Sequence, residues 1–156
     1  MVICDPLSTM KVVVFDFASP EYAEAVRLRY EVLRKPLGLY YSPPQIAREW
    51  RQMHLGLIDT SGRVQGSVSL ARLSGKVMKI RQMAIAPAFQ GKGYGRRLLN
   101  AAEQWAHFHG AHCVQLHARY YAVGFYQRCG YHIISSPFQE IGMPHYRMSK
   151  LLGITH

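Results

Sequence analysis

Gln90-Gly91-Lys92-Gly93-Tyr94-Gly95-Arg96-Arg97 lies between a predicted strand and a long predicted helix, and this stretch decides the fold. Its three glycines let backbone N–H groups approach a ligand without obstruction by a Cβ atom. The start of a helix adds unpaired donors and the positive end of the helix dipole. Lys92, Arg96 and Arg97 add positive charge at the same place. The stretch suits a pyrophosphate; the alternative interpretation is a flexible loop whose basic residues are incidental.

The spacing of this stretch excludes two better-known phosphate loops. A Walker loop needs Gly-Lys followed by Ser or Thr, whereas Gly91-Lys92 is followed by Gly93. A dinucleotide fingerprint needs the spacing G-x-G-x-x-G, whereas Gly91, Gly93 and Gly95 are each two residues apart. The loop therefore belongs to a third type.

The pattern on both sides of the loop predicts a mixed α/β architecture. Branched and aromatic runs predict strands, apolar residues at helical spacing predict helices, and Gly-containing turns join the middle strands into an antiparallel meander. The predicted strands are 12–17, 53–58, 64–73, 77–85, 113–117, 131–134 and 146–151. The predicted helices begin at Pro20, at Ile46, at the glycine cluster after Pro87 and at Ala122, and the first of them ends near Pro36.

The composition is that of one globular domain, residues 1–156. Apolar residues make up 49% and charged residues 18%, which excludes disordered, collagen-like and coiled-coil chains. The 19 Lys and Arg against 9 Asp and Glu give a net charge of +10, which favours an anionic partner.

Three cysteines, Cys4, Cys113 and Cys129, form no C-x-x-C pair, so they favour a reducing compartment over a disulfide framework. Apolar runs fall well short of the roughly 18 residues that span a bilayer. The first residues also lack the pattern of a signal peptide. These features predict a cytoplasmic protein without a membrane partner, in which residues 1–9 form a loose leader.

Gln90-x-x-Gly93-x-Gly95 resembles the Q/R-x-x-G-x-G/A signature of the GNAT superfamily of acyl-CoA N-acyltransferases. Upstream, Met83-Ala-Ile-Ala-Pro87 is similar to the strand end and proline that precede this loop in the family. Downstream, Ala122-x-x-Phe125-Tyr126-x-x-Cys129-Gly130-Tyr131 resembles a second family segment. The resemblance implies a GNAT-like fold, a central mixed, mostly antiparallel sheet flanked by helices.

Two further features refine this resemblance. Arg119 stands where the family often has Asn, which leaves the local contact to the cofactor open. The tail from Glu140 to Met148 has the pattern E-x-G-x-P-H-x-x-M, which is similar to the ElaA-like branch of the superfamily.

The resemblance implies acetyl-CoA as the co-substrate. Its pyrophosphate is expected on the backbone amides at the start of the long helix, and its pantetheine arm beside the end of the preceding strand. A free N–H at that strand end is expected to stabilise the oxyanion of the tetrahedral intermediate. The expected cofactor-binding residues are Met83, Ala84, Ile85, Gln90, Gly91, Lys92, Gly93, Tyr94, Gly95 and Arg96.

By its position in the second motif, Tyr126 is the expected acid that protonates the departing thiolate. A phenol with an ordinary pKa of about 10 stays protonated at neutral pH and can donate this proton. Without the resemblance, Tyr126 would be an ordinary core aromatic beside Phe125.

Several residues compete for the role of the base that accepts the proton of the amine. His117, His145 and Glu140 are the expected catalytic candidates, each with the alternative of a structural histidine or a solvated carboxylate. Glu31 on the first helix and a chain of waters are weaker alternatives.

Arg29 is a candidate for the acceptor cleft, and a group of histidines is a candidate for a metal site. Arg29 lies among apolar residues of the first helix, where we expect a snorkelling side chain; the alternative is that it points into the acceptor cleft. His107, His109, His112 and Cys113 are grouped in sequence, but His107 and His109 do not share a helix face, so no metal site is expected.

The leading functional prediction is an N-acetyltransferase that moves acetyl from acetyl-CoA to a primary amine of a small molecule or peptide. The alternative is a catalytically idle acyl-CoA-binding sensor or interaction module. Nucleic acid is not an expected partner, because no recognition motif accompanies the positive charge. A homodimer is left open. The acceptor is not identified by sequence, although basic and aromatic residues in 40–44 and 140–145 favour acidic or aromatic amines.

Overall fold

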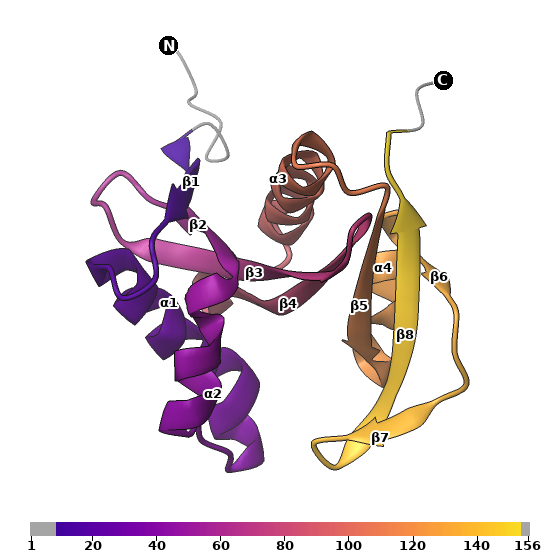
Figure 1. Ribbon diagram of the computed structural model, residues 1–156. Coiled ribbons are helices and arrows are strands. Elements are labelled where there is room, and N and C mark those ends of the chain that lie inside the picture. The colour runs from indigo at the N-terminus through magenta and orange to yellow at the C-terminus, as the bar shows by residue number, and fades with distance from the viewer. Residues whose placement is uncertain (1–8, 154–156) are drawn as a thin grey trace.

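The computed structural model describes residues 9–153 and confirms the predicted mixed α/β fold (Figure 1). Within these residues, eight strands form one sheet in the order β1-β2-β3-β4-β5-β8-β6, and β7 pairs with β8. All neighbouring pairs are antiparallel except β4 and β5, which run parallel. Of the leader expected at residues 1–9, residues 1–8 lie outside the described part.

The bounds of the regular elements follow the predicted order. The strands are β1 (Lys11–Phe15), β2 (Met53–Ile58), β3 (Val64–Ser74), β4 (Val77–Ile85), β5 (Cys113–Arg119), β6 (His132–Ile133), β7 (Phe138–Glu140) and β8 (Met143–Leu151). The α-helices are α1 (Pro20–Arg29), α2 (Pro43–Ala47), α3 (Tyr94–Phe108) and α4 (Val123–Arg128). Among the described helices, none is both long enough and apolar enough to cross a membrane.

The first helix starts and stops where its sequence predicts. Ser19 caps α1 by accepting a hydrogen bond from the Tyr22 amide at 3.1 Å. A π-helical turn (Tyr30–Arg34) and a 3-10 turn (Lys35–Leu37) continue α1 and end at Gly38, which has φ of 68°. These turns extend the helix to the edge of a cavity that Arg34 lines.

Three elements differ most from the prediction. The second helix begins at Pro43 rather than Ile46, because Ser42 and Gln45 form a capping box and proline fits the first turn of a helix. Strand β7 was not predicted, and β8 begins at Met143 rather than Tyr146. A two-residue turn joins them, in which Ile141 and Gly142 have φ of 46° and 78°; Gly142 is an ordinary residue for such a turn, whereas a branched residue at the first position is rare.

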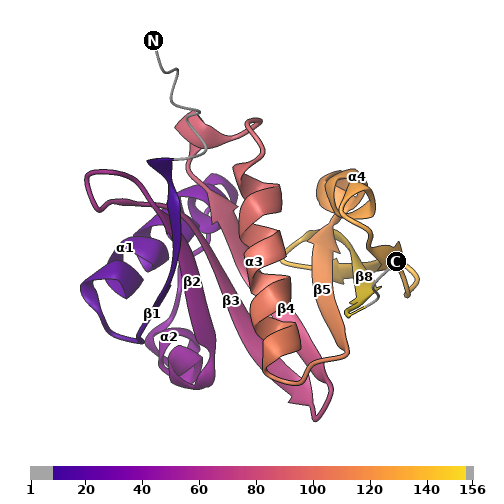
Figure 2. The same ribbon diagram turned by 90° about the horizontal axis from the view of Figure 1, so that it is seen from above.

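The sheet is covered on both faces. Helix α3 packs over one face and buries Leu98, Leu99 and Ala102 against Leu57, Leu70 and other strand residues. A second, smaller cluster places Tyr22 and Ala25 of α1 against Phe15 and Val64. Figure 2 shows α3 in front of β3 and β4, with α1 behind the strands. The central strands therefore lie between the two helices.

Candidate active site

A cavity opens where two neighbouring strands separate. Strands β4 and β5 pair only at Val77–Lys79 with Cys113–Gln115, and beyond this point they diverge (Figure 1). A cavity of about 520 Å³ lies at this divergence, between the two strands, α4 and the turns after α1. Its polar lining residues are Arg34, Lys79, Arg81, Gln82, Gln90, His117, Arg119, Tyr121, Tyr126, Glu140 and His145.

Strand β4 carries a bulge on the side of the cavity. Ser69 pairs with Arg81 and Ser67 with Ala84, so Val68 lies opposite two residues, Gln82 and Met83. Gln82 has φ of 57°, and its side-chain oxygen accepts a hydrogen bond from the Tyr41 hydroxyl at 2.8 Å. The bulge turns Met83 toward the cavity, which Met83 lines. Sequence reasoning marked the end of this strand but not the bulge.

The other two strand residues expected at the cofactor lie further along β4. Ala84 pairs with Ser67 and Ile85 with Gly66, and the side chain of Ala84 is buried. Beyond Lys79, the edge of β4 that faces β5 pairs with no strand among the described residues. An extended ligand arm could therefore pair with the backbone of this edge.

The glycine loop directly follows β4 and leads into α3. Gly91 and Gly93 have φ of 74° and 86°, and a Cβ atom on either would meet nothing within 4 Å. Gly93 is the N-cap of α3, so the first-turn amides of a 15-residue helix open beside the loop. Gln90 joins the loop to β4 by donating to the Ile85 carbonyl at 2.9 Å. The ring of Tyr94 packs in the core, so its expected contact with a cofactor would involve its backbone.

The three basic residues of the loop have different surroundings. Arg97 donates to the Met10 carbonyl at 2.6 Å, which joins it to the residue before β1. Arg96 reaches the Arg128 carbonyl at 3.3 Å, and the Lys92 ammonium lies 5.9 Å from the centre of the Phe89 ring. Within residues 9–153, Lys92 and Arg96 are therefore the two loop cations that form no hydrogen bond to the segment before β1.

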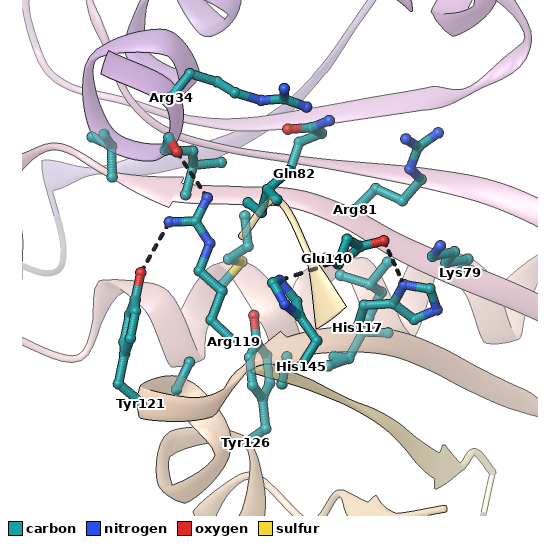
Figure 3. A pocket seen from close by; sticks show the side chains of 18 of the residues that line it. Arg34, Lys79, Arg81, Gln82, His117, Arg119, Tyr121, Tyr126, Glu140 and His145 are labelled. Carbon is teal, nitrogen blue, oxygen red and sulfur yellow. Dashed lines mark hydrogen bonds and ion pairs between the residues drawn. The ribbon is translucent and has the colours of Figure 1, made fainter. Parts of the chain in front are cut away.

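Tyr126 enters the cavity from α4. Its ring is buried against Phe125 and Tyr131, and its side chain lines the cavity (Figure 3). Burial is the main reason that its pKa rises to about 12. Among the described residues its hydroxyl has no hydrogen-bond partner. The phenol therefore stays protonated throughout the neutral range, with its proton free to be donated to a ligand.

The three expected base candidates come together in one cluster. Nδ1 of His117 lies 3.2 Å from Oε1 of Glu140, and Nε2 of His145 lies 3.5 Å from Oε2 of the same carboxylate. Nδ1 of His145 lies 3.0 Å from the Met143 carbonyl oxygen, so this nitrogen carries a proton. The β7–β8 hairpin supplies Glu140 and His145, and β5 supplies His117. Glu140 thus lies between two imidazoles.

His117 and Lys79 have perturbed pKa values in the same part of the cavity. Burial, followed by the charge of Lys79, lowers the pKa of His117, although the bond to Glu140 acts in the opposite direction. Burial, followed by the charge of Arg81, lowers the pKa of Lys79. A neutral imidazole beside a carboxylate is a suitable acceptor of a proton at neutral pH.

Arg119, the departure from the family pattern, has a structural role. Its guanidinium donates to the Leu33 carbonyl at 2.8 Å and to the Tyr121 hydroxyl at 2.9 Å. These bonds join the turn after α1 to the end of β5 and so close one side of the cavity.

The expectation that Arg29 snorkels to solvent is wrong, and so is its alternative of pointing into the cleft. Its side chain is 1% exposed and forms a two-point ion pair with Glu49. Glu31 also lies outside the cavity, where it is exposed and within 3.4 Å of Lys35. The exposed position removes the geometric support for Glu31 as a base.

The histidines near the end of α3 have separate contacts. His109 stacks on Trp105 with ring centres 3.6 Å apart, and Cys113 lies 3.0 Å from the Ser149 hydroxyl. Within residues 9–153 no group of three or more His, Cys, Asp or Glu side chains is arranged to hold a metal ion.

Sequence reasoning missed the basic residues of β4 that line the cavity. Lys79 and Arg81 alternate with Met78 and Ile80, which are buried under α3, so their side chains lie on the opposite face. Charged residues at alternate positions of a central strand are the pattern that could have marked them.

Comparisons with known proteins agree with this architecture. The model of the acetyltransferase (GNAT) domain matches residues 30–152. A candidate N-acetyltransferase from Lactobacillus plantarum has 27% identity and a TM-score of 0.83, over 92% of this chain and 99% of that chain. An uncharacterized protein of Bacillus subtilis is 34% identical over 80 residues, 51% of this chain. The chain spans about half the length of the curated relatives that it matches, 54% of this one.

Two more distant structures share the fold. ElaA of Escherichia coli has 17% identity and a TM-score of 0.75, over 90% of this chain and 99% of that chain. A GNAT family acetyltransferase from Elizabethkingia anophelis with acetyl-CoA bound has 16% identity and a TM-score of 0.71, over 92% and 99%. Since the family model covers most of the chain, and the glycine loop, bulge and cavity lie inside the matched region, the protein belongs to the GNAT acetyltransferase family.

Proposed function

We propose that the protein transfers the acetyl group of acetyl-CoA to a primary amine by direct attack. One observation carries the proposal: the protonated hydroxyl of Tyr126 lines the same cavity as His117, Glu140 and His145, which we call the Glu140 cluster. The acyl-transfer reaction needs an acid for the sulfur and a base for the amine in one place. Acetyl-CoA bound to the related Elizabethkingia anophelis structure supports the choice of co-substrate.

In this proposal, acetyl-CoA lies across the gap between β4 and β5. Its pyrophosphate binds the amides of Gly91 to Arg96, with Lys92 and Arg96 supplying charge. The pantetheine arm follows the open β4 edge beside Met83, Ala84 and Ile85. The carbonyl of the thioester then lies near the bulge at Gln82 and Met83, where a backbone N–H stabilises the oxyanion.

The chemical step moves one proton from the amine and one to the sulfur. The amine nitrogen forms a bond to the thioester carbon, and its proton passes to the pair formed by Glu140 and His117, directly or through a water. The C–S bond then breaks as the tetrahedral intermediate collapses, and the departing sulfur receives the proton of Tyr126. The lowered pKa of His117 keeps its imidazole neutral at pH 7, ready to hold the proton that the amine gives up.

Two measurements on the full chain test the proposal. Calorimetry with acetyl-CoA tests the cofactor, and free-thiol release from a panel of primary amines tests the reaction. Binding together with amine-dependent thiol release supports the proposal. Binding without turnover of any amine would instead indicate an idle acyl-CoA-binding module, and failure to bind acetyl-CoA would overturn both interpretations.

A further inference from the structure

The charges that line the cavity are strongly unbalanced. Four cations, Arg34, Lys79, Arg81 and Arg119, face one carboxylate, Glu140. Both Glu140 oxygens already face histidines, and none of the four cations forms an ion pair within residues 9–153. Hydrogen bonds to Leu33 and Tyr121 fix the guanidinium of Arg119, so Arg34, Lys79 and Arg81 are the three cations whose side chains can turn to a ligand.

The phosphates of acetyl-CoA do not account for these three cations. The proposed phosphate site lies at the start of α3, on the face of the sheet that α3 covers. Met78 and Ile80, which alternate with Lys79 and Arg81 along β4, pack under α3. Lys79 and Arg81 therefore project from the opposite face of the sheet. The thioester and the pantetheine arm carry no charge that would reach across the sheet.

The cations that line the cavity repel one another. Lys79 is half-buried; Arg81 and Arg147 act on it as like charges, and Glu140 is the one opposite charge among the described residues that acts on it. Like charges held together in a partly buried site destabilise the fold unless an anion joins them, and such arrangements are concentrated at functional sites.

Arg34 is held in place by its neighbours. Its guanidinium lies 4.6 Å from the centre of the Tyr41 ring, and the Tyr41 hydroxyl is fixed on Gln82 of the β4 bulge. A guanidinium stacked on an aromatic ring keeps its edge for hydrogen bonds to an anion. In the view of Figure 3, Arg34 and Arg81 lie above the cavity and Tyr126 rises from below, with Glu140 between them.

We propose that Arg34, Lys79 and Arg81 bind an anionic group on the acceptor, so that the substrate is an amine that also carries a carboxylate or a phosphate. The inference rests on the proposed function. The anion anchors the acceptor at the far side of the cavity, and its amine then reaches the Glu140 cluster and the thioester. Arginine forks suit both anions, because each offers two oxygens in one plane.

Matched acceptors test the inference on the full chain. Aminoalkyl carboxylates from 3-aminopropanoate to 6-aminohexanoate are compared with their amides, and with aminoalkyl phosphates of the same length. Wild-type protein is expected to favour the charged member at the best length by roughly tenfold or more in kcat/KM, the value of one charge-assisted hydrogen bond. Whether the carboxylate or the phosphate series is preferred identifies the anion.

Variants distinguish a specific anion site in the cavity from a general attraction of anions to the positively charged protein. R81Q and R34Q are expected to reduce the ratio of kcat/KM for the charged acceptor to that for its neutral amide, mainly through the KM of the charged acceptor. R27Q is the matched control, because Arg27 is exposed on α1 and outside the cavity, yet it removes the same charge. Equal effects of R27Q and R81Q, or no preference in the wild-type protein, would overturn the inference and leave the proposed function standing.

A protein without measurable turnover still tests the anion site. Binding of the same carboxylates and amides to the protein saturated with CoA is measured by calorimetry. Charge-dependent binding that R81Q removes supports the site even if no acetylation occurs. Equal binding of carboxylate and amide contradicts it.

Discussion

Arg29 and Glu49 form a buried ion pair with two contacts, Nη1 to Oε1 at 2.7 Å and Nη2 to Oε2 at 2.8 Å. Tyr22 donates to Oε1 of the same carboxylate at 2.7 Å, and Nε2 of His54 lies 3.0 Å from the Glu49 backbone oxygen. The pair joins α1 to the turn before β2 and so fixes the helix that leads to Arg34. A structural pair thus sets one wall of the proposed acceptor site.

Replacing Arg29 with methionine is expected to destabilise the protein strongly. The carboxylate of Glu49 would stay buried without its cation, which costs about 3 to 5 kcal/mol. Urea unfolding followed by circular dichroism measures the loss. R27M is the control, since Arg27 is exposed on the same helix and its loss should change stability by less than about 0.5 kcal/mol. A loss for R29M no larger than that for R27M would contradict the structural role.

Sequence reasoning could find Arg29 as unusual but not its partner. Glu49 lies 20 residues away in a segment of turns, and only the fold brings the two together. Periodicity predicted the strands and helices well because most of them bury one regular face. It missed β7, because the strand has only three residues and its turn places the branched Ile141, before Gly142, at a positive φ.

Replacing Tyr126 with phenylalanine is expected to lower kcat by roughly 10²-fold or more, because the sulfur loses its acid. Affinity for acetyl-CoA should change little, since the ring that packs against Phe125 and Tyr131 remains. Thiol release at saturating amine and calorimetry measure the two quantities. Y120F is the control, because Tyr120 is exposed and outside the cavity. Wild-type turnover in Y126F would remove Tyr126 from the mechanism.

The pH dependence of kcat/KM should have one steep limb on the acidic side. The lowered pKa of His117 places that limb below the ordinary histidine value of about 6.5, because protonated His117 cannot accept a proton. Tyr126 has a pKa of about 12, so its deprotonation should cause no loss of activity up to pH 10. A profile measured between pH 5 and pH 10 with one weakly basic amine checks both statements, because an ordinary amine with a pKa of about 10 would add an acidic limb of its own.

Two variants should move the acidic limb in opposite directions. E140Q removes a group that raises the pKa of His117, so the limb should shift to lower pH. K79M removes a positive charge that lowers it, so the limb should shift to higher pH. The amine used here carries no carboxylate or phosphate, since K79M also alters the proposed anion site. Shifts in the same direction would show that the limb does not report His117.

The site itself was predictable only where it depends on short motifs. The glycine loop and Tyr126 follow from local spacing. His117, Glu140 and His145 were separate candidates, and only the pairing of β5 and β7 with β8 joins them in one cluster. Lys79, Arg81 and Gln82 depend on where β4 separates from β5 and on the bulge, which no single segment specifies.

Gly93 provides the sharpest test of the cofactor loop, because the chain contains a matched control in Gly62. Both glycines have left-handed φ, 86° and 81°, and a Cβ atom on either would meet nothing within 4 Å. Alanine at either position therefore costs the same backbone strain, about 1 to 2 kcal/mol. Only Gly93 lies at the start of α3, where a Cβ atom would occupy the side from which a pyrophosphate reaches the amides.

G93A is therefore expected to weaken acetyl-CoA binding by roughly 10- to 100-fold, the loss of one charge-assisted hydrogen bond, whereas G62A should bind as the wild-type protein does. Calorimetry with acetyl-CoA measures affinity, and urea unfolding verifies that both variants lose similar stability. Equal stability losses with unequal affinities would assign the effect to the loop, because strain is then the same in both variants. Equal affinities would show that the phosphates do not bind on these amides.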